Sequence, residues 1–215
     1  MKSVELAPGV FHLQSGSNLG LLVEDGQALL IDTGLDDDAG RRALRILEEQ
    51  NAELVGIVIT HAHADHFGGA QYLQRRLGAP VYAPDLEAVM MEHPIIEPLY
   101  LFGGAAPIVA LRQKFTLAEP CRVDQTMGPG PLEVGPFELS IVPLPGHALN
   151  QVGVAVETDG QRVLFCADAT IAEARESADQ QREQLRADVD TIVDQLRSIE
   201  QSGNLSRRIT EGQPM

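Results

Sequence analysis

Cysteine is scarce in this chain: Cys121 and Cys166 are the two cysteines among 215 residues. Two cysteines cannot form the disulfide framework that stabilises many small secreted proteins. The first residues, MKSVELAPGVFHL, lack the apolar core and small-residue cleavage site of a secretory signal. We therefore expect a cytoplasmic protein.

Long apolar runs and clustered basic residues are also lacking. The longest apolar runs have about the length of a strand, so we expect no membrane-spanning helix. Lysine and arginine total 16 against 31 acidic residues, and no basic stripe is present that could bind nucleic-acid phosphates. We expect a small-molecule substrate rather than nucleic acid or a membrane, and the sequence leaves formation of a homo-oligomer open.

What the chain does contain is a dense group of metal-ligand residues in the segment VGIVITHAHADHFGGA, residues 55–70. His61, His63 and His66 fall within six positions, and Asp65 precedes the last of them. The β-branched run before them is typical of a strand buried on both faces. Alternate residues at its end share a face, so His61 and His63 can point the same way. The alternative is a solvated helix cap, but three closely spaced histidines do not contribute to such a cap. We therefore predict a metal site.

Two further candidate ligands lie later in the chain. His147 follows the predicted strand 137–144 at a Pro-Gly turn, and Asp168 ends the segment RVLFCAD, residues 162–168. Either residue alone is more often part of a turn. Strand ends that share one rim of a sandwich could bring both to the histidine cluster.

Apart from the candidate ligands, the sequence pattern before residue 170 predicts several strands, two helices and a lid segment. Asp25-Gly26 and Asp159-Gly160 indicate tight hairpin turns. The expected strands are 10–14, 19–24, 27–32, 54–60, 80–84, 137–144, 151–157 and 162–168, and the expected helices are 37–50 and 67–80. Residues 85–130 read as broken helices or a lid rather than sheet. Their apolar side chains could line a substrate pocket or only cover the core: Met90, Met91, Leu99, Tyr100, Leu101, Phe102 and Leu111.

The C-terminal segment has a different character. Residues 171–201 have a strongly helical composition, with one apolar stripe at steps of four and three formed by Leu185, Val189, Ile192, Leu196 and Ile199. We expect a helix packed on a domain formed by residues 1–170. Residues 202–215 show no strand pattern and are expected to be a disordered tail.

The segment THAHADHFGG matches H-x-H-x-D-H, the signature of the metallo-β-lactamase superfamily. The segments LLIDTG (29–34), PGH (145–147) and FCAD (165–168) resemble its other recurrent segments, in the same order. The resemblance covers roughly residues 10–170. It implies an α/β fold, an αββα sandwich of two mixed β-sheets flanked by helices, with a metal site at one edge.

The resemblance also implies roles for individual residues. His61, His63 and His147 correspond to ligands of a first metal ion, and Asp65 and His66 to ligands of a second. Asp168 corresponds to a carboxylate that bridges the two ions. Asp32 resembles the buried aspartate behind the site, whose task would be to orient a ligand imidazole; a turn or cap role is the alternative.

One departure from the family pattern concerns the second ion. The superfamily usually supplies a last histidine near its C-terminus, but no histidine follows His147 in this chain. The second ion would then bind more weakly, or take water or a carboxylate from residues 173–194. One or two divalent ions are expected, with zinc favoured and Mn²⁺ or Fe²⁺ as alternatives.

The expected activity is hydrolysis of an ester, thioester, lactone, amide or phosphoester by a metal-activated water. Asp65 is the candidate proton acceptor. The segment PGHALNQVG differs from the GHTPGS of many hydroxyacylglutathione hydrolases, which counts against that thioester activity. β-Lactam cleavage is not expected because no export signal is seen.

Two other functions stay open. A mononuclear iron enzyme that oxygenates persulfides would use His61, His147 and Asp168 as its ligand triad. A degenerate, non-catalytic member would bind or regulate a partner. Of the remaining histidines, His12 is expected to be structural or exposed, and His93 lies in the lid region, where an approach to the substrate is the minor alternative.

Overall fold

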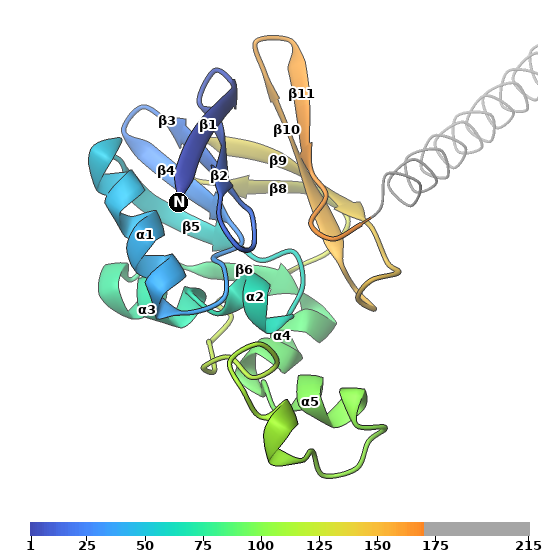
Figure 1. The fold of residues 1–215 in the computed structure, drawn as a ribbon. Helices are drawn as coiled ribbons and strands as arrows, with labels where there is room; N and C mark the ends of the chain where they lie inside the picture. The colour runs from blue at the N-terminus through green and yellow to red at the C-terminus, as the bar shows by residue number, and fades with distance from the viewer. Residues whose placement is uncertain (170–215) are drawn as a thin grey trace, which may run out of the picture. The chain divides into compact units, whose positions relative to one another are not determined.

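Two β-sheets form the centre of the computed structural model, which describes residues 1–169. The first sheet has seven strands in the order β1-β2-β3-β4-β5-β6-β7, antiparallel from β1 to β4 and parallel from β4 to β7. The second has four strands in the order β11-β10-β9-β8 and is antiparallel throughout rather than mixed. The predicted α/β sandwich is confirmed (Figure 1).

The strands of the first sheet are β1 (Lys2–Ala7), β2 (Val10–Gln14), β3 (Leu19–Glu24), β4 (Gln27–Ile31), β5 (Glu53–Val58), β6 (Val81–Pro84) and β7 (Gln125–Met127). Those of the second are β8 (Gly130–Val134), β9 (Phe137–Pro143), β10 (Val152–Thr158) and β11 (Gln161–Phe165). The helices are α1 (Asp37–Glu49), α2 (Ala64–Phe67), α3 (Ala70–Leu77), α4 (Asp85–Glu92), α5 (Ile96–Leu101) and the short 3-10 helix η1 (Val109–Leu111).

Strand β4, in the middle of the first sheet, is buried on both faces because it is apolar from residue 28 to residue 31. In β4, Leu30 points into the core shared with α1 and α3, whereas Leu29 and Ile31 point into the core between the two sheets. This is the two-sided burial that a continuous apolar run predicts. The expected helix 171–201, its packing and the tail 202–215 lie outside the described residues.

Both predicted hairpin turns are confirmed. Asp25 and Gly26 between β3 and β4 have φ angles of 47° and 75°, and Asp159 and Gly160 between β10 and β11 have 48° and 72°. Positive φ at both central positions is the geometry that Asp-Gly turns favour between antiparallel strands.

The structure differs from the expectations at five places. Within the range 67–80 expected as one helix, α3 begins only at Ala70, and a separate helix, α2, ends at Phe67 before Gly68 and Gly69. Strands β1 and β8 were not expected, and β7 lies inside the segment 85–130 where no strand was expected. Strand β7 is too short for a periodic signal, and β8 contains Pro131, which an edge strand tolerates. Strand β11 ends at Phe165, so Asp168 lies on the loop that follows.

No helix among residues 1–169 is long and apolar enough to cross a membrane.

Glycine at position 69 lets the α2–α3 junction pack against the loop after β4. A Cβ atom there would lie 2.6 Å from the carbonyl oxygen of Thr33. We expect Gly69→Ala to lower the free energy of unfolding by about 1–3 kcal/mol, because the backbone must move apart. Gly128→Ala is the control, since nothing lies within 4 Å of its added Cβ. Equal stability of the two variants in urea titrations would contradict this packing constraint.

Candidate metal centre

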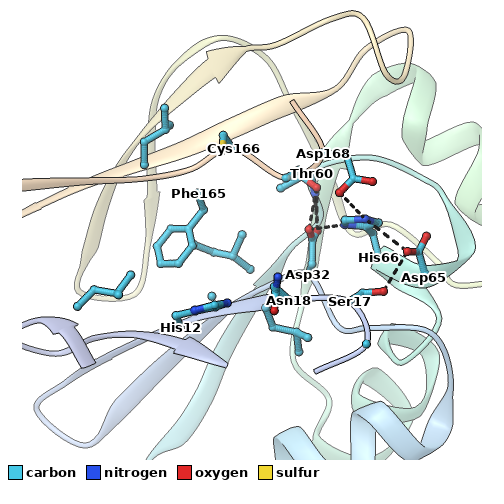
Figure 2. A pocket seen from close by; sticks show the side chains of 17 residues that line it. His12, Ser17, Asn18, Asp32, Thr60, Asp65, His66, Phe165, Cys166 and Asp168 are labelled. Atoms are coloured by element: carbon cyan, nitrogen blue, oxygen red, sulfur yellow. Dashed lines mark hydrogen bonds and ion pairs between the residues drawn. The ribbon is translucent and has the colours of Figure 1, made fainter. Parts of the chain in front are cut away.

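The candidate ligands meet at one rim of the sandwich. His61 and His63 lie on the segment that joins β5 to α2, and Asp65 and His66 lie in α2. These four residues follow the carboxyl end of a parallel strand of the first sheet. His147 and Asp168 come from the second sheet, on the β9–β10 loop and the loop after β11; Asp168 is shown with Asp65 and His66 in Figure 2.

Three ring nitrogens converge in the first group, formed by His61, His63 and His147. Their ligand atoms all lie within 4.8 Å of one another. Nδ1 of His63 is 3.1 Å from Nε2 of His61 and 2.9 Å from Nε2 of His147. One ring proton cannot satisfy three nitrogens that face each other, whereas a cation among them can. The donor set therefore fits a metal ion.

The second group consists of His61, His66 and Asp168, again with ligand atoms within 4.8 Å. Nε2 of His66 lies 3.4 Å from Oδ1 of Asp168, and Nε2 of His147 lies 3.3 Å from Oδ2 of the same carboxylate. Asp65 Oδ2 is 3.8 Å from His66 Nε2. The Asp168 carboxylate thus faces both groups, as a bridging ligand would. All six residues that the sequence proposed as ligands are brought together.

Asp32 and Thr60 orient two of these imidazoles from behind. The buried Asp32 carboxylate accepts hydrogen bonds from the Thr60 backbone amide at 2.8 Å and from Nδ1 of His66 at 2.8 Å (Figure 2). The Thr60 hydroxyl donates to Asp32, which leaves its lone pair for Nδ1 of His61 at 3.2 Å. With each Nδ1 engaged in this way, both rings turn Nε2 towards the site.

Two side chains contact candidate ligands in a way that the sequence did not predict. The Tyr100 hydroxyl on α5 lies 2.7 Å from Nε2 of His63, so this side chain contacts a candidate ligand rather than only lining an apolar wall. The Ser17 hydroxyl, on the β2–β3 loop, donates to Oδ2 of Asp65 at 2.9 Å. The segment SGSN around Ser17 carries no recognisable motif, so its position could be found from the fold alone.

Burial and neighbouring charges set the protonation of the rings. Burial lowers the pKa of His61 strongly and also lowers the pKa of His63, which leaves both neutral and able to bind metal at neutral pH. Burial also disfavours the charged form of His66, but Asp32, Asp65 and Asp168 outweigh it and raise its pKa to about 9. The carboxylates that favour a proton on His66 equally favour a metal cation in its place.

Other residues proposed from the sequence lie elsewhere. Met91 is fully buried in the core between the first sheet and its helices, so it lines no pocket. His93 follows the end of α4 and is exposed. The side chains of Leu99, Leu101 and Phe102 are exposed.

A cavity of about 440 Å³ adjoins the second group. Asp65, His66 and Asp168 line one end, and Phe165 from β11 forms part of its apolar wall (Figure 2). Its other lining residues include His12, Asn18, Leu6, Ile31 and Leu164. The volume is within the range of small-molecule sites.

Comparison with known proteins gives the chain its family. The family model of the metallo-beta-lactamase superfamily matches residues 14–203. The chain is 29% identical to a hydroxyacylglutathione hydrolase of Shewanella pealeana, over 74% of the chain and 47% of that protein. It is 26% identical to a probable metallo-hydrolase, YqgX, of Bacillus subtilis, over 66% of the chain and 61% of that protein.

Solved structures agree on the fold. A metallo-β-lactamase of Cronobacter sakazakii matches with a TM-score of 0.61 and 25% identity, over 76% of the chain and 63% of that structure. A subclass B3 metallo-β-lactamase of Bradyrhizobium japonicum, 18% identical, matches with a TM-score of 0.62 over 78% of the chain and 62% of that structure, and supports the fold alone. The chain spans less than two thirds of the length of each of these proteins.

Asp32 can be tested apart from the ligands themselves. In Asp32→Asn one acceptor oxygen becomes an NH₂ group, which cannot accept the Nδ1 proton of His66. We expect zinc affinity to fall about 10–100-fold, as for other residues that orient metal ligands. Competition with a chromophoric chelator measures it. Asp38→Asn removes an exposed carboxylate on α1 and is the control; equal affinities of the two variants would exclude an orienting role for Asp32.

Proposed function

Because this chain belongs to the metallo-β-lactamase superfamily, we propose that it is a metal-dependent hydrolase that cleaves a small ester or thioester. The observation that carries the proposal is the pair of ligand groups that share His61 and face the two oxygens of Asp168. Thioesters are favoured among the substrate classes, because the curated relatives include hydroxyacylglutathione hydrolases. This outweighs the difference between PGHALNQVG and GHTPGS.

Zinc is the ion we propose. Three imidazoles are one of the ligand sets of catalytic zinc sites, in which water takes the fourth position. Residues His61, His63 and His147 would hold the first ion, and Asp65, His66 and Asp168 a second, with Asp168 between them. A bound divalent ion supplies Lewis acidity, which polarises a carbonyl oxygen and lowers the pKa of water to about 7.

The chain's own residues would handle the proton and the substrate. Asp65 is partly exposed and faces the cavity, so its carboxylate could accept a proton from the attacking water. Ser17 holds one oxygen of that carboxylate in place. The cleaved group would lie at the Asp168 end of the cavity, and the rest of the substrate would contact the apolar wall at Phe165.

The alternatives from the sequence gain less support. The iron-dependent reading uses His61, His147 and Asp168 as its ligand triad, which leaves His63 and His66 without a role although both belong to the converging groups. A non-catalytic role does not account for six candidate ligands gathered beside a cavity of substrate size. We expect the protein to act in the cytoplasm, and its oligomeric state follows from neither the fold nor the site.

His61 is a proposed ligand of the first ion and also belongs to the second group of converging ligand atoms, so its removal should weaken metal binding at both. We expect His61→Ala to lose bound zinc and measurable turnover while the chain stays folded. Elemental analysis and circular dichroism measure these. His93→Ala, which removes an exposed histidine away from the cluster, should retain both. Full zinc content and activity in the His61 variant would refute the assignment of the site.

Substrate class can be tested with protein loaded with zinc or manganese. A panel would hold a hydroxyacylglutathione, an unrelated acyl thioester, an aryl ester, a lactone and a phosphodiester. We expect the thioesters to be cleaved fastest, and Phe165→Ala to change KM more than kcat because Phe165 contacts only the remote part of the substrate. Absence of turnover on every class would contradict the proposal.

A further inference from the structure

We propose that Glu87 is a positioning residue that fixes the distance between the two loops carrying His61, His63 and His147. The inference rests on the proposed function, since its purpose is to set the geometry of the first ligand group. Glu87 lies in α4, at the start of the segment between β6 and β7 that the sequence indicated only as a lid or substrate region.

The geometry of Glu87 is that of a clamp. Its side chain is 1% exposed. One carboxylate oxygen accepts a hydrogen bond from the Ala62 backbone amide at 2.8 Å, and the other accepts one from the Asn150 amide at 3.1 Å. Ala62 lies between His61 and His63, and Asn150 lies three residues after His147. One carboxylate therefore joins the ligand loops of the two different sheets.

Neither amide has a strand partner at this point. Strand β5 ends at Val58, and Asn150 precedes β10. The Ala62 amide is buried and the Asn150 amide is half-buried, and an amide removed from water without an acceptor destabilises the fold. Glu87 provides an acceptor for both amides. It can do so only when the two loops lie close enough to bind the same carboxylate. The neighbouring Asp85 adds a bond to Nδ2 of Asn150 at 2.6 Å.

A second buried carboxylate binds another backbone amide of the same ligand loop, two residues after Ala62. The buried Glu97 of α5 accepts a hydrogen bond from the Ala64 amide at 3.1 Å. The amides of Ala62 and Ala64 are thus held by acids from α4 and α5, while the side chains at 61 and 63 face the site. In this segment two carboxylates take the place of a neighbouring strand.

The consequence is a ligand group whose spacing is set before metal binds. Nδ1 of His63 and Nε2 of His147 lie 2.9 Å apart although their loops come from different sheets. Without the clamp, metal binding would have to order the two loops itself. Metal affinity should fall while the fold, held by the two cores, persists.

Glu87→Gln is the direct test, because glutamine has the size of glutamate but one acceptor oxygen instead of two. Its NH₂ group would face a backbone N–H, so one of the two loops must be released. We expect about 10-fold weaker zinc binding or more, in the range seen when groups supporting metal ligands are changed. Chelator competition measures the affinity, and the spectrum of the Co²⁺-substituted protein reports the ligand geometry.

Glu92→Gln is the matched control. Glu92 lies on the same helix and accepts one bond, from the Val123 amide, which glutamine can still accept. We expect it to keep wild-type zinc affinity. If Glu87→Gln lowers only the melting temperature of the metal-free protein and leaves zinc affinity and the Co²⁺ spectrum unchanged, Glu87 is merely structural and the inference is overturned.

A measurement on the unaltered chain covers the case in which the variant does not fold. The amides of Ala62 and Asn150 should exchange hydrogen slowly although they lie outside the strands, and rapid exchange of either one overturns the clamp. Wild-type protein that binds zinc while Glu87→Gln binds it equally well overturns this inference alone. Wild-type protein that binds no zinc overturns the proposed function with it.

Discussion

The constraint on which the site depends is that imidazole nitrogens must face one point without protons between them. A neutral imidazole has one protonated and one free nitrogen. A hydrogen-bond acceptor or donor behind the ring therefore determines its tautomer. The Asp32 carboxylate accepts a hydrogen bond from Nδ1 of His66, and the Thr60 hydroxyl lies beside Nδ1 of His61. Burial keeps His61 neutral by lowering its pKa. At His61 the result is a neutral ring that can bind a cation, whereas the carboxylates around His66 favour positive charge there, either a proton or a metal ion.

The fold meets this constraint by bringing strand ends to one rim. Asp32 follows β4, and Thr60 and His61 follow the parallel neighbour β5, so the orienting acid and the first ligand lie side by side. His147 and Asp168 arrive from the second sheet. Asp32 has a left-handed φ of 59°, which aspartate adopts more readily than most residues. Its bonds to Thr60 and His66 hold it in this conformation.

Sequence alone indicated the parts of this arrangement that depend on local pattern. The Asp-Gly turns, the burial of β5 and the grouping of His61, His63, Asp65 and His66 all follow from neighbours in the chain. Other features depend on contacts that no pattern records. Gly68 and Gly69 interrupt a predicted helix because backbone from residues 33 and 35 approaches there. Ser17, Tyr100 and Glu87 reach the site from loops and helices 25 to 63 residues away from their partners.

Diffraction data collected on both sides of the zinc absorption edge, from protein purified without chelators, test the central claim most directly. The account predicts an anomalous peak bounded by Nε2 of His61, Nδ1 of His63 and Nε2 of His147. Crystals without such a peak from protein supplied with zinc, or with the ion bound away from these three nitrogens, would contradict it.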